Sequence, residues 1–209
     1  MNYYNSDGSL AEMCGNGVRC AAKFFLKETN SKVKDLLIDT RAGIKKIICN
    51  EDDLSAQAGS FSVNMGMPVF LHKDFPEGPL TLQNHVFNFV SMGNPHAVAL
   101  VDDISKINLF DIGPKIENDQ HFPNKINAEF VEKVSENYFK VKVWERGSGE
   151  TLACGTGACS VYATLKKQNK NLGEVTLEFP GGKLFLSDNE KGEIILRGPA
   201  VCVFKGEMM

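Results

Sequence analysis

Cys14-Gly15-Asn16-Gly17 and Cys154-Gly155-Thr156-Gly157 are the two stretches that decide how this chain folds. They start 140 positions apart, and each runs directly into a segment with helical periodicity. Apolar residues follow both cysteines at offsets 4, 7, 8 and 11: Val18, Ala21, Ala22 and Phe25 in the first copy, and Ala158, Val161, Tyr162 and Leu165 in the second. This spacing puts apolar side chains on one face of a helix. The sequence therefore predicts two helices, each with a cysteine at its N-terminus.

A cysteine at the start of a helix is in a position that favours reactivity. The unpaired N–H groups and the helix dipole favour a thiolate and can hold an anion. Glycine at these positions permits close approach of the backbone to a ligand. Two cysteines of this kind in one chain suggest an acid and a base that face each other.

The duplication extends beyond the two turns. Asn5 lies nine residues before Cys14, and Glu145 lies nine residues before Cys154, both in Gly/Ser-rich approaches. Further along, the apolar run that starts at Leu36 is matched by one that starts at Val175, 139 positions later. A repeat this long is not a solenoid period. It predicts two homologous halves whose matching loops meet at a pseudo-twofold axis.

Composition narrows the class of protein. The chain has 209 residues, 43% of them hydrophobic, which is enough for two small cores. Its net charge is −3 with scattered Lys and Arg, which argues against nucleic acid as a partner. We find neither an apolar run of membrane-spanning length nor a signal-peptide pattern, so we expect a cytoplasmic protein without a membrane partner. The six irregularly spaced cysteines favour free thiols in a reducing compartment.

A coarse reading of the chain predicts two helices, at residues 15–28 and 155–167, and a short helical turn within Ile104–Ile116. Strand-like runs separated by turn signals are Leu36–Asp39, Lys45–Cys49, Phe61–Met65, Val86–Ser91, His96–Val101, Phe130–Val134, Tyr138–Trp144, Glu174–Phe179, Leu184–Ser187, Glu193–Leu196 and Val201–Lys205. Many strands around few helices indicate the α+β class.

Outside the two turns, His96 and Glu145 carry the clearest signals. His96 follows Asn94-Pro95 at the end of an apolar strand, where a loop residue can face a cleft. Glu145 is the repeat-equivalent of Asn5, beside the second cysteine turn. Neither turn has the Gly-Lys-Ser/Thr of a Walker loop. A zinc site is a weaker alternative, because the Cys-x5-Cys and Cys-x4-Cys spacings exceed the usual short knuckle. The remaining cysteines are expected to act as small hydrophobes: Cys20, Cys49, Cys159 and Cys202.

These motifs together resemble the diaminopimelate epimerase family. The matching stretches, in the family's order, are Asn5-Ser6-Asp7-Gly8-Ser9, residues 12–20, Gly93-Asn94-Pro95-His96-Ala97-Val98, Asn127-Ala128-Glu129-Phe130 and residues 145–157. The resemblance implies two pseudosymmetric domains, each a mixed sheet curled around a central helix. It also implies that the C-terminal strand returns to the first domain. The expected division is residues 1–54 plus 200–209 for the first half and residues 55–199 for the second.

This chain departs from the family pattern at its start. Family members begin with a strand segment that carries a His-Gly-x-Gly-Asn-Asp-Phe motif, whereas this sequence begins just before Asn5. We therefore expect the first domain to be truncated and the site to be short of at least one substrate contact.

The resemblance implies an isomerase that converts LL-2,6-diaminopimelate to meso-diaminopimelate in lysine and peptidoglycan precursor synthesis. One cysteine thiolate would remove the α-proton and the other thiol would return a proton to the opposite face, without any cofactor or metal. The implied catalytic residues are Cys14, Cys154, His96 and Glu145. The implied substrate-binding residues are Asn5, Gly15, Asn16, Asn94, Asn127, Glu145, Arg146, Gly155 and Thr156. A homodimer is also implied.

Two other functions stay open at this stage. A proline or hydroxyproline racemase shares the fold and the pair of cysteines, but its first turn usually reads Cys-Gly-His, where this chain has Cys14-Gly15-Asn16. A compact cyclic substrate would also have no use for Arg146. The second alternative is a truncated paralogue that binds an amino acid with weak catalysis or none.

Overall fold

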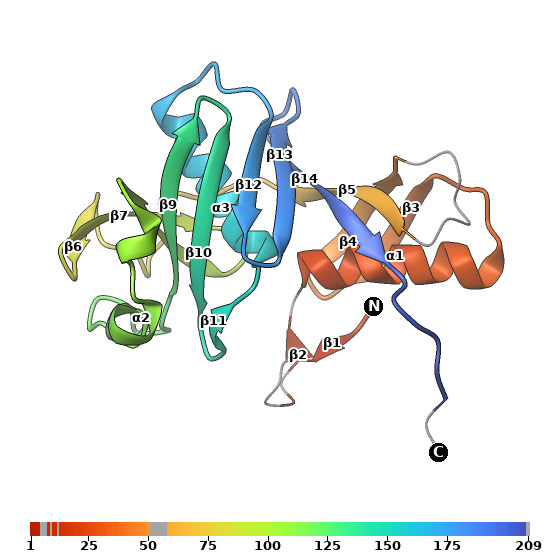
Figure 1. The fold of residues 1–209 in the computed structure, drawn as a ribbon, viewed down its shortest axis with the longest axis horizontal. Coiled ribbons are helices and arrows are strands. Elements are labelled where there is room, and N and C mark those ends of the chain that lie inside the picture. Colours follow the sequence, from red (N-terminus) through yellow and green to blue (C-terminus); the bar gives the residue numbers. More distant parts are fainter. Residues whose placement is uncertain (5–7, 9, 12, 51–57, 208–209) are drawn as a thin grey trace. The chain divides into compact units, whose positions relative to one another are not determined.

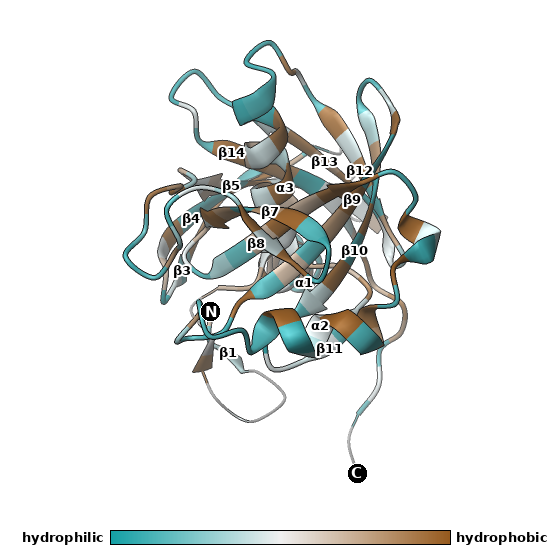
Figure 2. Cartoon of the chain, turned by 90° about the vertical axis from the view of Figure 1, so that its left-hand side faces the viewer, coloured by the Kyte–Doolittle hydropathy of each residue, from teal (hydrophilic) through white to brown (hydrophobic). Residues whose placement is uncertain are grey.

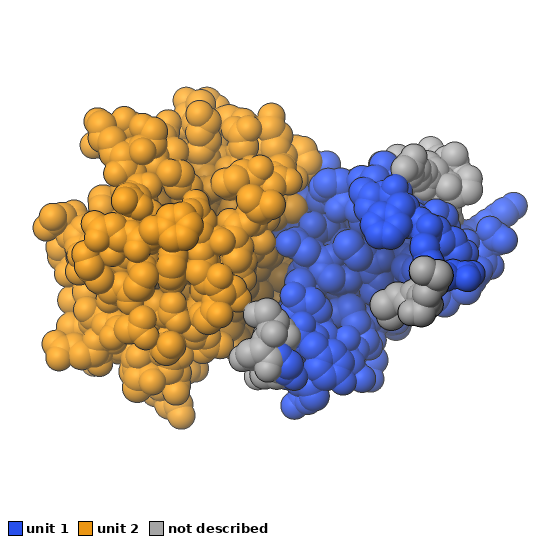
Figure 3. Space-filling model, turned by 60° about the horizontal axis from the view of Figure 1, so that its bottom comes forward, with its two compact units in different colours: residues 1–64, 196–209 blue, residues 65–195 orange. Residues whose placement is uncertain are grey.

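The structure is a computed structural model, and it describes residues 1–4, 8, 10, 11, 13–50 and 58–207. The chain forms two compact units, coloured separately in Figure 3. Unit 1 contains residues 1–64 and 196–209, and unit 2 contains residues 65–195. The chain passes from unit 1 into unit 2 within strand β5 (Ala58–Gly66) and returns within strand β14 (Ile194–Val201). The boundaries expected from the sequence, after residues 54 and 199, concern homologous halves rather than compact units, and they stay a prediction.

Unit 1 combines one long helix with a small sheet (Figure 1). Two antiparallel strands of two residues each, β1 (Tyr3–Tyr4) and β2 (Leu10–Ala11), precede helix α1 (Gly15–Thr29). Strands β3 (Asp35–Thr40) and β4 (Gly43–Cys49) pair antiparallel, and β4 pairs antiparallel with β5. The strand order is β3-β4-β5-β14.

The core of unit 1 follows from alternation along β5. Gly59, Phe61 and Val63 are buried while the residues between them are not, which is the period of two expected for a strand with one covered face. Val18 and Leu26 of α1 are buried in the same unit. Complete burial of a side chain the size of Phe61 contributes about 1.5–3 kcal/mol to stability.

The buried face of α1 differs from the face that the sequence predicts. Val18 and Ala22 are fully buried as expected, but Phe25 is 47% exposed. Leu26, four residues after Ala22, takes the core position instead. Arg19 and Lys23 are also buried, so the buried face of α1 includes charged residues that an apolar pattern does not identify.

Arg19 ties the first turn of α1 to the end of β14. Its guanidinium donates to the Gly15 carbonyl at 3.1 Å, to Asn16 Oδ1 at 3.0 Å and to the Pro199 carbonyl at 3.3 Å. The planar fork of arginine suits several acceptors held at fixed angles. These hydrogen bonds compensate the burial of the charge, which leaves Arg19 only 5% exposed.

Unit 2 is a mixed sheet with the strand order β13-β12-β10-β9-β8-β7-β6, and β11 pairs with β10 at its side. The pairs β8–β9 and β10–β12 are parallel, and the other described pairs are antiparallel. The elements are β6 (Leu80–Leu82), β7 (His85–Ser91), β8 (Pro95–Val101), the 3-10 turn η1 (Ile104–Lys106), α2 (Leu109–Glu117), β9 (Asn127–Ser135), β10 (Tyr138–Glu145), β11 (Gly149–Thr151), α3 (Gly155–Gln168), β12 (Val175–Phe179) and β13 (Gly182–Asp188).

Helix α3 is the centre of unit 2. Residues 157–165 are buried without a break, so the helix is covered on every side rather than along one stripe. It contacts β13 near one end of the strand order and β7 near the other, as well as β8 and β9. The sheet therefore curls around α3, as the family resemblance implies, and the chain is an α+β protein. The four apolar residues predicted for this helix face, Ala158, Val161, Tyr162 and Leu165, are all buried.

Helix α2 covers the outer part of the unit 2 sheet and closes a second apolar cluster. Leu109 and Ile116 of α2 are buried in a cluster with Phe89 and Phe130 from the strands. Figure 2 shows brown, apolar segments on α2 and on β9. Gly113 allows the helix to lie directly on the Trp144 ring, whose Nε1–H donates to Glu117 Oε2 at 2.7 Å.

Most expected elements are present within one to three residues of their predicted bounds. The strand predicted at Val201–Lys205 is wrong in its position, because β14 runs from Ile194 to Val201 and the described residues after it, 202–207, form no strand. Val203 and Phe204 are 76% and 82% exposed, so the alternation that suggested a strand has no core to face. The short strands β1, β2, β6 and β11 were not predicted. Among the described residues, no helix has both the length and the apolar character needed to cross a membrane.

Gly113→Ala should destabilise unit 2. A Cβ at Gly113 would lie 2.6 Å from Trp144 Cε3 and 2.7 Å from Cγ, and both ring atoms belong to a side chain held by Glu117. We expect the free energy of unfolding to fall by about 1–3 kcal/mol, as for other overpacked sites. The measurement is urea unfolding monitored by Trp144 fluorescence, since Trp144 is the only tryptophan. Gly173→Ala is the control, because a Cβ there meets nothing within 4 Å. Equal losses in the two variants would contradict this packing.

Arg19→Lys should destabilise unit 1 while keeping the positive charge. A lysine ammonium cannot reproduce the fork that joins Gly15, Asn16 and Pro199, so some of these three hydrogen bonds are lost. We expect a loss of about 1–3 kcal/mol in urea unfolding. Arg41→Lys changes an exposed arginine and serves as the control. An unchanged midpoint for Arg19→Lys would show that the fork is not needed.

Candidate active site

Both cysteines of the repeated motif occupy the N-cap position of a helix. Cys14 caps α1 in an extended backbone conformation, and its Sγ accepts from the Gly17 N–H at 3.3 Å. Cys154 caps α3 in the same conformation, and its Sγ accepts from the Gly157 N–H at 3.4 Å. In each turn the cysteine carbonyl accepts the first helical hydrogen bond at 2.9 Å. The predicted placement of a sulfur at each helix start is therefore confirmed.

In unit 1 the first turn contains Cys14, Gly15 and Asn16. Arg19 holds this turn through the Gly15 carbonyl and the Asn16 side chain. Cys14 is half-buried. Asn5, which the sequence assigns to substrate binding, lies outside the residues that the structure describes.

In unit 2 four elements bring predicted site residues together around Cys154. Strand β8 supplies His96, whose Nε2 lies 3.1 Å from Asn94 Oδ1. Strand β9 begins at Asn127, which is the register partner of His96 in the parallel β8–β9 pair. Strand β10 ends at Glu145, and α3 begins just after Cys154.

Asn127 links these elements through its side-chain amide. Its Nδ2 donates to the Pro95 carbonyl at 2.7 Å, and its Oδ1 accepts from the Arg146 N–H at 2.9 Å. The Arg146 guanidinium, which is exposed, donates to the Asn124 carbonyl at 3.0 Å. One asparagine therefore fixes the start of β8 relative to the loop that carries Arg146.

Glu145 and Thr156 complete the described surroundings of Cys154. Glu145 Oε1 accepts a hydrogen bond from the Thr151 hydroxyl across the β10–β11 hairpin. The Thr156 hydroxyl lies 3.5 Å from Cys154 Sγ. Gly155 is buried in the first turn of α3.

The electrostatics of Cys154 correct one expectation from the sequence. A helix start favours a thiolate, but burial of the Cys154 thiol raises its pKa well above the usual value, and the nearby Glu145 and Glu129 carboxylates add to this effect. The hydrogen bonds from Thr156 and Gly157 act in the opposite direction and are smaller. The surroundings of Cys154 therefore favour its thiol form over the thiolate.

Two acidic residues of the site lie outside the set predicted from the sequence. Glu129 Oε1 lies 2.7 Å from His96 Nδ1, and both side chains are fully buried. Glu117 accepts from the Gly147 N–H at 3.0 Å and from the Trp144 ring, and so holds the loop that follows Arg146. A carboxylate in the middle of the apolar run Ala128–Val131 is the signal that could have identified Glu129.

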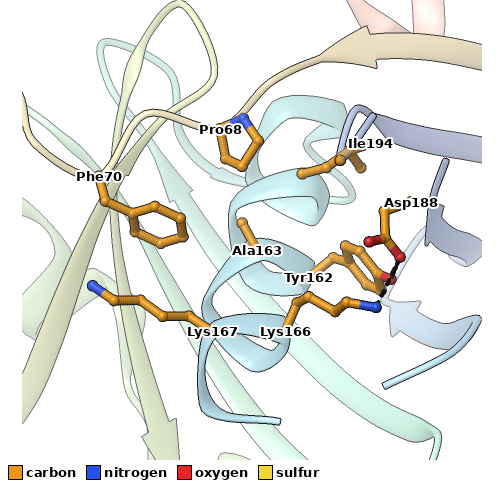
Figure 4. A pocket seen from close by; sticks show the side chains of 9 residues that line it. Pro68, Phe70, Tyr162, Ala163, Lys166, Lys167, Asp188 and Ile194 are labelled. Atoms are coloured by element: carbon orange, nitrogen blue, oxygen red, sulfur yellow. Dashed lines mark hydrogen bonds and ion pairs between the residues drawn. The ribbon is translucent and has the colours of Figure 1, made fainter. Parts of the chain in front are cut away.

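A shallow pocket in unit 2 contains none of the predicted site residues (Figure 4). It lies along the later turns of α3, beside Tyr162, Ala163 and Lys167, with Pro68 and Phe70 across from the helix. The Lys167 ammonium lies 4.6 Å from the centre of the Phe70 ring. Tyr162 and Lys166 both donate to Asp188, at 2.6 and 3.0 Å. Asp188 therefore satisfies the polar side chains of Tyr162 and Lys166 in this pocket.

No group of three or more His, Cys, Asp or Glu side chains in the described part of the chain has the arrangement of a metal site. Cys20, the nearest cysteine in sequence to Cys14, is exposed on α1, while Cys159 is buried in α3. Cys20 and Cys159 therefore differ in exposure, and neither lies at a helix start.

Solved structures with related folds include two that are described as epimerases. A hydroxyproline epimerase from Agrobacterium vitis aligns over 95% of this chain and 67% of its own, with a TM-score of 0.69 and 12% identity. A predicted epimerase from Pseudomonas aeruginosa aligns over 98% and 79%, with a TM-score of 0.67 and 14% identity. At such identities the likeness establishes the fold and nothing more.

Sequence relatives give a narrower assignment. The chain is 40% identical to a diaminopimelate epimerase from Prochlorococcus marinus (strain NATL1A), over 100% of this chain and 76% of the relative. It is 42% identical to one from Carboxydothermus hydrogenoformans, over 99% and 77%, and 38% identical to one from Methanococcus maripaludis (strain C5), over 100% and 79%. The profile of the diaminopimelate epimerase family matches residues 1–71 and 88–203. The chain therefore belongs to the diaminopimelate epimerase family, a family of isomerases.

Proposed function

We propose that this chain epimerises LL-2,6-diaminopimelate to meso-diaminopimelate by a cofactor-independent two-base mechanism. The observation that carries the proposal is the pair of equivalent N-cap cysteines, Cys14 and Cys154, in a member of this family. Each sulfur accepts an N–H at a helix start, where negative charge is stabilised.

The two cysteines together supply and accept all the protons that the proposed reaction moves. A thiolate removes the α-proton and becomes a thiol, and the other thiol gives its proton to the opposite face of the carbanion and becomes a thiolate. The enzyme thus ends each turnover with the same number of protons. In the direction where Cys14 is the base, the high pKa of Cys154 suits it to the role of acid.

The hardest step is to stabilise charge as the α-carbon loses its proton. Preorganised N–H groups at the first turns of α1 and α3 would bind the α-carboxylate, through Gly15 and Asn16 and through Gly155 and Thr156. His96 and Glu145 would adjust the protonation of the cysteines. Hydrogen bonds to a charged group are stronger than neutral ones, and they are stronger still where water is excluded. Such bonds would therefore lower the barrier to removal of the α-proton.

The distal end of the substrate carries a second ammonium and carboxylate. We assign its recognition to Asn5, Asn94, Asn127 and Arg146. Asn127 makes two hydrogen bonds within the described part of unit 2, and an amide with these two bonds has a second N–H and a second lone pair for a ligand. The Arg146 guanidinium is exposed and makes one described backbone contact, which leaves N–H groups for a bidentate carboxylate pair.

This function places the enzyme in the synthesis of lysine and of the peptidoglycan precursor, and in the cytoplasm. The six cysteines all lie in the described residues and are free thiols there, which suits a reducing compartment. A homodimer is the assembly that the family resemblance implies, and size-exclusion chromatography with light scattering tests it.

The test of the function is proton exchange at the α-carbon. The protein is incubated with LL-diaminopimelate in deuterated water, and loss of the α-proton signal is followed by NMR. Exchange with diaminopimelate but not with proline or hydroxyproline supports the proposal. Exchange of proline alone would favour a racemase, and no exchange at all would favour an amino-acid-binding protein.

Cys14→Ala and Cys154→Ala should each reduce exchange by a factor of about 10³ or more, because each removes one of the two proton-transfer groups. The matched controls are Cys20→Ala, an exposed cysteine on α1, and Cys159→Ala, a buried cysteine on α3. Both controls should keep substantial exchange. Near-normal turnover in either N-cap variant would rule out the two-base mechanism.

Arg146→Lys should raise KM for diaminopimelate about tenfold, because lysine lacks the planar fork that pairs with a carboxylate. Steady-state kinetics measure the change. L-Lysine, which has no distal carboxylate, should be a poor substrate of the unmodified enzyme. Arg41→Lys provides the control, since Arg41 is exposed in unit 1. Efficient racemisation of L-lysine would contradict the role of Arg146.

A further inference from the structure

Glu129 is a fully buried carboxyl group on β9 that the proposed mechanism does not use. Its Oε1 lies 2.7 Å from His96 Nδ1, and neither side chain has any exposed surface. Its other oxygen, Oε2, is buried without a hydrogen-bond partner in the described part of the protein. A buried carboxyl group with an unsatisfied oxygen lowers the stability of the fold, which suggests that Glu129 has a role in the site.

The carboxyl group also lies directly against the turn that carries Cys154. A Cβ placed on Gly157 would come 2.5 Å from Glu129 Oε1 and 3.2 Å from its Cδ. Gly157 is the residue whose N–H donates to Cys154 Sγ. Glu129 therefore contacts the same short turn that holds the sulfur, and it contacts His96 on the other side.

We propose that Glu129 is a positioning residue for the second cysteine: a buried carboxylate that holds the His96 ring and keeps Cys154 in its thiol form. This inference rests on the proposed two-base function. It adds a residue that acts through His96 and through the charge around Cys154, without touching the substrate.

The orientation of His96 follows from its two neighbours. Nδ1 faces Glu129 Oε1 and Nε2 faces Asn94 Oδ1, so both ring nitrogens point at oxygen atoms. When Nδ1 carries a proton it donates to the Glu129 carboxyl group, which fixes the angle of the ring. Without Glu129, the buried ring would lose that partner.

The charges around Cys154 come from three strands. Glu145 on β10 and Glu129 on β9 both raise the pKa of the Cys154 thiol, after the larger effect of burial. Burial raises the pKa of Glu129 above its usual value and Glu145 adds to this, while His96 on β8 acts in the opposite direction and favours the carboxylate. Strands β13 and β7 also pack on α3, but Asp188 of β13 is bonded to Tyr162 further along the helix, and His85 of β7 stacks on Phe130.

The consequence for the reaction is a wider alkaline range. Proton delivery needs one cysteine in its thiol form, and activity falls at high pH as that thiol ionises. A carboxylate beside Cys154 delays this ionisation. If Glu129 becomes neutral, the Cys154 thiol loses its proton at lower pH, and the alkaline limb of kcat/KM moves to lower pH.

The test uses Glu129→Gln in the full chain, with Glu136→Gln as the matched control. Glutamine keeps the size of the side chain and an acceptor for His96, but it removes the charge. Glu136 is an exposed acid in the turn after β9. Alkylation of Cys154 by iodoacetamide is measured against pH by peptide mass spectrometry, with Cys14 in the same sample as an internal reference.

We expect Glu129→Gln to move the Cys154 alkylation midpoint down by about one pH unit, and the alkaline limb of kcat/KM with it. Glu136→Gln and the Cys14 midpoint should not change. An unchanged Cys154 midpoint in a folded Glu129→Gln protein overturns the proposal. The alkylation result does not depend on turnover, so a protein that fails to exchange diaminopimelate protons refutes the proposed function without deciding the role of Glu129.

A measurement on the unmodified protein covers the case in which Glu129→Gln does not fold. Carbon-13 NMR of glutamate-labelled protein follows the Glu129 carboxyl across the pH range in which Cys154 becomes alkylated. A carboxylate signal throughout that range supports the proposal. A carboxyl group that stays protonated while Cys154 ionises would carry no charge, and the proposal would be wrong.

Discussion

The hydrogen bond from the Gly157 N–H to Cys154 Sγ is the contact on which the site in unit 2 depends. Helix α3 is covered on every side, so water cannot satisfy the N–H groups of its first turn as it does at an exposed helix start. A side chain must do so, and a cysteine at this position provides a sulfur acceptor. The requirements of folding and of chemistry therefore meet at one atom, because the group that caps the central helix is also the group proposed to move a proton.

The two cysteine turns share a backbone but differ in charge. One turn beyond Cys14 comes Arg19, whose guanidinium is bonded to the turn itself. The equivalent position in the second copy, 140 residues later, is the uncharged Cys159. Around Cys154 the neighbouring charges are instead the carboxylates of Glu129 and Glu145. Among the described residues, the two turns therefore have similar backbones but are bonded to, or surrounded by, side chains of different charge.

The sequence predicts most of the framework because the framework depends on local patterns. The Cys-Gly-x-Gly turns, the helical spacing after them and the alternating strands all leave traces within a few residues of one another. Phe25 and the stretch after Val201 are where this reasoning fails, since both look apolar and neither meets a core. Exposure is decided by distant parts of the chain, and a local pattern carries no information about them. The same limit explains Glu129 and Glu117, whose roles arise from partners on other strands and loops.

The second glycine of the repeated motif has a different meaning in each copy. At Gly17 a Cβ would meet the Cys14 side chain at 3.4 Å, an ordinary van der Waals distance, so the first turn has room for alanine. At Gly157 the same atom would overlap the Glu129 carboxyl. Equivalent glycines of the duplicated motif therefore differ in how well they tolerate a larger side chain. In a library that randomises both positions, functional variants should accept small residues at 17 and retain glycine at 157, so the second copy records the presence of the buried acid beside it.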